Sequence, residues 1–179
     1  MRIVSGSLGG RVFDSPGTER THPMSDKMRG ALFNILGDLT DLTVLDAFGG
    51  SGALAFEAIS RGAATALILE QDRLAQKTIA SNMAKLGLRG AVTLANVAAG
   101  SWLTTSEAQY FDVILCDPPY DDLQPHLLER LAQRVAPNGI FVLSCPVSSP
   151  VLTLPSLEHL RQQTYGTAQL LFYRRGVID

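Results

Sequence analysis

The sequence has few of the residues from which disulfide frameworks and metal sites are built. Its 179 residues include only two cysteines and three histidines. Cys116 and Cys145 form no Cys-x-x-Cys pair, and the histidines have no ligand spacing with one another or with carboxylates. We therefore predict neither a disulfide scaffold nor a bound metal, and we expect both cysteines to be buried.

Long hydrophobic runs are also absent. No stretch approaches the roughly 20 apolar residues that a membrane-spanning helix needs, and residues 1–6 lack the apolar core of a secretory signal. Hydrophobic residues make up 46% and charged residues 18% of the chain, which is typical of a globular domain. We expect a cytoplasmic protein that does not associate with membranes.

An overall positive charge is missing as well. The chain has 15 Lys and Arg against 17 Asp and Glu, a net charge of −2, which excludes a strongly basic nucleic-acid binder. The charge is uneven, however. Basic residues outnumber acidic ones in the first 29 positions, where they are Arg2, Arg11, Arg20, Lys27 and Arg29.

What the sequence does have is an alternation of strand and helix patterns. Apolar runs predict strands at 44–46, 66–69, 92–95, 111–116 and 140–143, followed by an antiparallel pair at 163–165 and 169–173. Helical spacing predicts a helix from Ser25 to Leu36 before the first strand, and further helices between the strands, including one from Leu123 to Val135. This order predicts an α/β, Rossmann-like, doubly wound and mainly parallel sheet.

The N-terminal residues do not follow this alternation of strands and helices. Arg2–Gly6 and Arg11–Asp14 resemble two short strands around the glycine-rich turn at 8–10. We therefore divide the chain into residues 1–24, a short β-hairpin arm with a loop, and residues 25–179, the main domain.

A glycine turn marks a nucleotide-like site. The strand at 44–46 runs into Phe48, Gly50 and Gly52, a helix follows, and Glu70 ends the next strand, where its carboxylate can accept both hydroxyls of a ribose. This spacing also satisfies a dinucleotide fingerprint. The turn alone therefore leaves both a nicotinamide and S-adenosylmethionine open.

Three further positions favour S-adenosylmethionine. Asp46 precedes the glycines, where a carboxylate would face an ammonium or a ribose, and Asn96 ends a third strand and can reach an adenine edge. A fourth strand ends at Asp117. The carboxyl ends of parallel strands form one crevice, so these side chains should converge there.

The most informative motif is the corner Asp117-Pro118-Pro119-Tyr120. Two successive prolines end the strand and hold the chain stiff and extended. The Asp117 carboxylate and the Pro118 carbonyl then form a cluster of acceptors beside the flat face of Tyr120. This arrangement suits a planar group with an NH2, such as a nucleobase edge.

Together these motifs resemble the RsmD-type methyltransferases, which methylate the exocyclic N2 amine of a guanine in small-subunit (16S) ribosomal RNA. The resemblance covers most of the chain: residues 1–6, 10–11, 29–36, 45–54, 117–120 and 165–174. It implies a class I methyltransferase fold and a partly assembled small ribosomal subunit as partner. It also implies catalysis by Asp117, Pro118, Pro119 and Tyr120, cofactor binding by Asp46, Phe48, Gly50, Gly52, Glu70 and Asn96, and RNA binding by Arg2, Arg11, Arg20 and Arg29.

The chain departs from the family pattern at three places. It has His22-Pro23-Met24 where the family tends to have Arg-Pro-Thr, Gly30 where an acidic residue is usual, and Gly49 where alanine is more usual. Other functions stay open beside the resemblance. They are a nicotinamide oxidoreductase, a non-catalytic RNA-binding assembly factor, and an amino-methyltransferase that acts on adenine N6 in DNA or RNA or on a glutamine amide.

Overall fold

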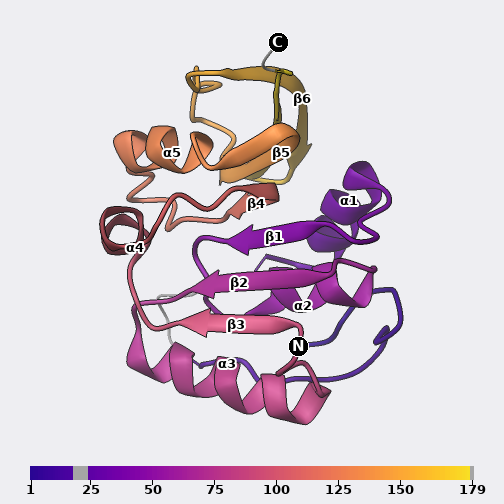
Figure 1. The fold of residues 1–179 in the computed structure, drawn as a ribbon. Coiled ribbons are helices and arrows are strands. Elements are labelled where there is room, and N and C mark those ends of the chain that lie inside the picture. The colour runs from indigo at the N-terminus through magenta and orange to yellow at the C-terminus, as the bar shows by residue number, and fades with distance from the viewer. Residues whose placement is uncertain (18–23, 178–179) are drawn as a thin grey trace.

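A computed structural model describes residues 1–17 and 24–177, so that Arg20, His22 and Pro23 lie outside the described residues. One seven-stranded sheet organises the molecule, in the order β3-β2-β1-β4-β5-β7-β6 (Figure 1). The strands are β1 (Thr43–Asp46), β2 (Thr65–Leu69), β3 (Val92–Ala95), β4 (Phe111–Cys116), β5 (Val135–Pro146), β6 (Leu157–Tyr165) and β7 (Ala168–Arg175).

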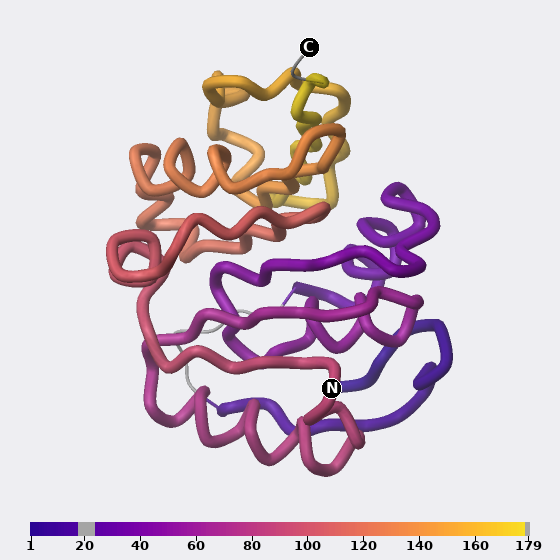
Figure 2. Tube along the Cα trace, viewed as in Figure 1, coloured from indigo at the N-terminus to yellow at the C-terminus, as the bar shows by residue number. Residues whose placement is uncertain are grey.

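Strands β1 to β5 pair in parallel, whereas β7 pairs antiparallel with both β5 and β6. The helices that connect them are α1 (Asp26–Leu36), α2 (Ala53–Ser60), α3 (Arg73–Leu86), α4 (Ala99–Thr105) and α5 (Pro125–Ala132). One core cluster contains buried side chains of α1, α2 and α3, and a second contains those of α4 and α5. The doubly wound α/β fold is confirmed, and the tube in Figure 2 follows its path.

Two helices begin and end where the sequence signals indicated. The Ser25 hydroxyl accepts from the Met28 N–H at 3.2 Å at the start of α1, and Gly37 follows that helix with φ of 79°. Asp72 caps α3 through the N–H groups of its first turn, and Gly87 follows it in the left-handed conformation. Ser and Asp satisfy free N–H groups at such positions, while glycine adopts positive φ without strain.

The N-terminal segment makes the predicted antiparallel pairing over a shorter length. Arg2 and Val12 form an antiparallel bridge, and backbone hydrogen bonds join Ile3 to Arg11 and Phe13 to Met1, each at 3.0 Å. The side chains of Ile3 and Phe13 are 1% exposed and belong to the first core cluster, and the Phe13 ring packs edge-on against Phe56 of α2 at 5.4 Å. The segment therefore packs onto the domain, because its apolar side chains are buried there.

The helix predicted from Leu123 to Val135 is also shorter than expected. Helix α5 ends at Ala132, and Val135 already begins β5 and pairs with Phe111 of β4. Val135 matches the helical spacing because its side chain is apolar, and that side chain is buried in β5. The terminal antiparallel pair is confirmed, with longer strands than predicted. Within the described residues, no helix has the length and hydrophobicity to cross a membrane.

Candidate active site

The glycine turn after β1 is held by the neighbouring strand β2. The Gly49 N–H donates to the Leu69 carbonyl at 2.9 Å, and the Gly50 N–H donates to the Glu70 carboxylate at 2.7 Å. A Cβ at position 49 would lie 2.4 Å from the Cγ2 atom of Ile68, so a larger residue there would require the Ile68 side chain to shift. Gly50 and Gly52 both have positive φ. The backbone can therefore bend closely around the end of β1 and expose it to a ligand.

Asp46, the last residue of β1, is fully buried, and neither of its carboxylate oxygens has a hydrogen-bond partner. Burial, and after it the charge of Asp117, raises the pKa of Asp46 from 3.8 to about 8. The N–H groups of Phe48 and Ala55 face the carboxylate outside hydrogen-bonding geometry and lower its pKa only in part. A buried carboxylate without a partner is costly, and a cationic or hydroxyl-bearing ligand would satisfy it.

The proline corner lies at the same edge of the sheet. Strands β1 and β4 are parallel neighbours, with Asp46 paired to Leu115, so that Asp117 lies just beyond the end of β1. Burial raises the pKa of Asp117 from 3.8 to about 6. Pro118 is buried, and the Asp122 N–H closes the turn by donating to the Pro119 carbonyl at 3.0 Å. Asp46 and Asp117, which were predicted from separate motifs, thus lie close enough for the charge of one to raise the pKa of the other.

Ser144 is a site residue that the sequence motifs did not indicate. It lies on β5, one residue past Leu143, which pairs with Cys116, so its side chain reaches the proline corner. Its side chain is 1% exposed, its hydroxyl lies 2.7 Å from the Tyr120 hydroxyl, and it lies close enough to Asp117 to lower the pKa of that carboxyl. An ionised carboxylate only accepts, so when the Ser144 proton points toward Asp117, Ser144 accepts from Tyr120. This link fixes the Tyr120 ring, which is 42% exposed, beside the carboxylate.

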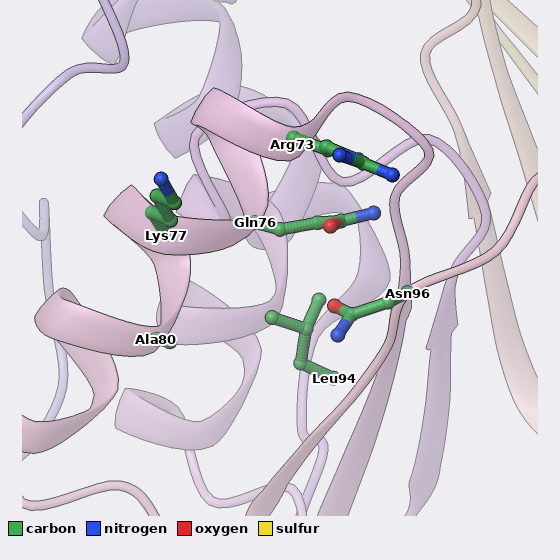
Figure 3. A pocket seen from close by; sticks show the side chains of 6 residues that line it. All are labelled: Arg73, Gln76, Lys77, Ala80, Leu94 and Asn96. Carbon is green, nitrogen blue, oxygen red and sulfur yellow. The ribbon is translucent and has the colours of Figure 1, made fainter.

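Glu70 and Asn96 occupy the β2 and β3 ends of the same edge. The Glu70 carboxylate accepts from the N–H groups of Gly50 and Asp72, both at 2.7 Å, so it organises the glycine turn. The Glu70 N–H donates to the Ala95 carbonyl at 3.2 Å, which places Asn96 next to it. The Asn96 side chain is exposed and lies in a pocket beside α3 (Figure 3).

Arg29 corrects the predicted set of RNA contacts. Its side chain is 0% exposed and donates to the carbonyls of Met24 and Arg2 and to the Asp26 carboxylate. It also lies 3.7 Å from the buried Glu57, which in turn accepts from the backbone of the N-terminal segment. Arg29 therefore anchors residues 1–5 inside the protein and cannot contact RNA.

The other predicted RNA contacts differ in their surroundings. Arg2 is exposed and pairs with Asp26 at 3.1 Å. Arg11 is exposed and donates to the carbonyls of Lys85 and Leu86 at the end of α3. Arg20 lies outside the described residues. In the part of the chain that the structure describes, no three His, Cys, Asp or Glu side chains gather in a metal-binding group.

Comparisons with known proteins agree with this geometry. A family model described as "Conserved hypothetical protein 95" matches residues 1–174. "Ribosomal RNA small subunit methyltransferase D" of Escherichia coli strain K12 is 31% identical over 183 residues, which cover 98% of this chain and 90% of that protein. A "tRNA1(Val) (adenine(37)-N6)-methyltransferase" of Shewanella loihica is 30% identical over 155 residues, covering 74% of this chain and 64% of that protein.

The solved structures give the same result. The structure entitled "Putative methyltransferase yhhF from Escherichia coli" superimposes with a TM-score of 0.89 at 29% sequence identity, and the match covers 99% of each chain. The match thus extends over 99% of this chain and is not confined to part of it.

Proposed function

The chain belongs to the RsmD-like family of small-subunit ribosomal RNA methyltransferases, which the "Conserved hypothetical protein 95" model describes, and we propose that it methylates the exocyclic N2 amine of a guanine in that RNA with S-adenosylmethionine as the methyl donor. The observation behind the proposal is the meeting of Asp46 and Asp117 at one sheet edge. The first can serve a cationic methyl donor and the second an acceptor amine.

The cofactor end of the site consists of residues around the glycine turn. S-adenosylmethionine, when bound, supplies a methyl group that its sulfonium already activates. The partnerless oxygens of Asp46 fit the positively charged or hydroxyl-bearing part of such a molecule. Glu70 would accept the ribose hydroxyls, while Gly50 and Gly52 let the backbone approach, and Phe48 borders the turn.

At the acceptor end, an aromatic amine is a poor nucleophile because its lone pair is delocalised into the ring. The Asp117 carboxylate and the Pro118 carbonyl would accept its two N–H bonds and so localise the lone pair. These hydrogen bonds strengthen as positive charge builds on nitrogen, which favours the transition state over the ground state. Asp117 then takes the proton, and its pKa of about 6 leaves it ionised at neutral pH.

Tyr120 completes the acceptor site. Its ring is half-exposed and its hydroxyl is held by Ser144, so the ring face can stack on a base that has left its helix or lies in a loop. Positioning of this kind can lower a barrier by up to about 7–11 kcal/mol in favourable cases. We further propose that residues 1–24 contribute RNA contacts through the exposed Arg2 and Arg11, and that the substrate is a partly assembled small subunit.

Adenine N6 is the second candidate acceptor, because the Shewanella relative is named for that activity. Product identification separates the two. Small ribosomal subunits and naked ribosomal RNA from cells that lack this protein would be incubated with labelled S-adenosylmethionine and analysed by nucleoside mass spectrometry. We expect N2-methylguanosine. N6-methyladenosine, or no labelled nucleoside from either substrate, would contradict the proposal.

A further inference from the structure

A groove lies between the first two turns of α3 and the end of the edge strand β3. It has a volume of about 290 Å³ and is lined by Arg73, Gln76, Lys77, Ala80, Leu94 and Asn96. Figure 3 shows the polar ends of Arg73, Gln76 and Asn96 turned toward a common space above Leu94, while the Lys77 ammonium points away along the helix. Donors and an acceptor thus border a groove that the chemistry described above does not use.

The charge of α3 stands out in a chain of net charge −2. Its 14 residues include Arg73, Lys77 and Lys85 but no Asp or Glu. Lys85 pairs with Asp14 at 3.4 Å. Arg73 and Lys77 are exposed and have no ion-pair partner within residues 1–17 and 24–177.

Helix stability does not explain these two charges. Arg73 is the first residue of α3, where a positive charge opposes the helix dipole at a cost of about 0.3–1 kcal/mol. Lys77 is four residues further along the same face, and like charges at this spacing cost about another 0.2–0.5 kcal/mol. Residues that weaken their own helix without pairing elsewhere are better explained by a ligand of opposite charge.

Hydrogen bonds link the groove to Glu70 at the edge of the active site. The Gln76 amide donates to the Glu70 carbonyl at 2.8 Å, and the Glu70 N–H donates to the strand that bears Asn96. Three strand spacings, about 15 Å in all, separate β3 from β4 and its Asp117. A few nucleotides of RNA span this distance.

We propose that this groove, which we call the α3 groove, binds the phosphate backbone of RNA that flanks the target nucleotide. The proposal rests on the proposed function, which makes RNA the substrate. Arg73 and Lys77 neutralise phosphates, and Gln76 hydrogen-bonds to ribose or phosphate oxygens. Asn96 borders the groove on the side of the proposed cofactor site.

The test compares two double variants that lose the same charge. Arg73→Ala/Lys77→Ala removes the basic pair of the α3 groove. Arg161→Ala/Arg174→Ala removes two exposed arginines from β6 and β7 at the opposite edge of the sheet. Binding to a fluorescent small-subunit ribosomal RNA transcript is measured over a range of salt concentrations. S-adenosylmethionine binding by calorimetry and methyl transfer to small subunits are measured beside it.

Each lost contact to single-stranded RNA lowers the salt slope by about 0.7, so two contacts correspond to about 25-fold weaker binding at 0.1 M salt. We expect this loss for the groove variant and not for the opposite-edge variant. The groove variant should bind S-adenosylmethionine with wild-type affinity, and its product should still be N2-methylguanosine. Equal RNA binding by both variants would overturn the proposal, and so would a loss of cofactor affinity in the groove variant, because the groove would then belong to the cofactor site.

Arg73→Ala alone provides an independent reading. We expect weaker RNA binding and an unchanged dissociation constant for S-adenosylmethionine, and the opposite pattern would contradict the proposal. Thermal unfolding checks that the variants fold, and the groove variant should be at least as stable as the wild type because it loses like-charge repulsion. If the wild type itself forms no N2-methylguanosine, the proposed function fails separately from the α3 groove, whose RNA binding is measured without catalysis.

Discussion

Replacing Ser144 by alanine should shift the acid side of the pH–activity profile. Asp117 acts as a carboxylate, so activity is present above its pKa of about 6 and is lost as the pH falls through that value. The Ser144 hydrogen bond lowers this pKa, and its removal therefore raises it. A hydrogen bond to a charged group contributes about 1.5 kcal/mol, which corresponds to about one pKa unit.

The size of the effect depends on pH. With a pKa of about 6, roughly 90% of Asp117 is ionised at pH 7, and with a pKa of about 7 roughly 50% is ionised. The loss of kcat/KM for RNA should thus be about twofold at pH 7 and about tenfold at pH 5.

The assay is initial-rate methyl transfer to small subunits between pH 5 and 8 at saturating S-adenosylmethionine. Ser144→Thr keeps the hydroxyl and should retain the wild-type midpoint. Tyr120→Phe removes the other partner of Ser144 but keeps the link to Asp117, so it should weaken RNA binding more than it moves the midpoint. If Ser144→Ala lowers the rate equally at every pH, the hydroxyl does not act through the ionisation of Asp117 and the reasoning fails.

Three further outcomes follow from the geometry. Asp46 holds a proton below its pKa of about 8, whereas a sulfonium ligand favours the carboxylate form. Cofactor binding to the wild type at pH 7 should therefore release about one proton, and binding to Asp46→Asn should release none. Calorimetry in buffers of different ionisation enthalpy measures this release. Glu70→Ala should bind S-adenosylmethionine at least about 10-fold more weakly by calorimetry, because a carboxylate partner is lost, and an unchanged affinity would remove Glu70 from the ribose site. Arg29→Ala removes one charge partner of the buried Glu57, so it should lower the free energy of unfolding in urea by about 3 kcal/mol. An unchanged midpoint of urea unfolding would refute the anchoring role of Arg29.

Local signals predicted the parts of the site that lie on single strand–turn units. Asp46 and Asp117 each end an apolar strand, and the rule that parallel strands share a carboxyl edge was enough to place them together. Helix ends were predicted where a cap residue and a glycine flanked the apolar pattern, as at Ser25 and Gly37.

What the sequence did not predict depends on contacts between distant segments. Ser144 lies 24 residues beyond Tyr120, and its position beside the corner follows from the register of β4 and β5, which no local pattern specifies. Arginine is usually an exposed residue, and Arg29 is buried because it pairs with the buried Glu57 of another helix. Val135 satisfied helical and strand spacing equally, and pairing with β4 decided between them.

Methyl transfer by an Asp117→Ala variant tests the central claim most directly, namely that this carboxylate serves the acceptor amine while Asp46 and Glu70 serve the cofactor. Turnover on small ribosomal subunits and S-adenosylmethionine affinity are measured on the same preparation. We expect turnover to fall by about 10²-fold or more while cofactor affinity stays within about twofold of the wild type. Undiminished turnover, or a loss that cofactor affinity alone accounts for, would contradict the account.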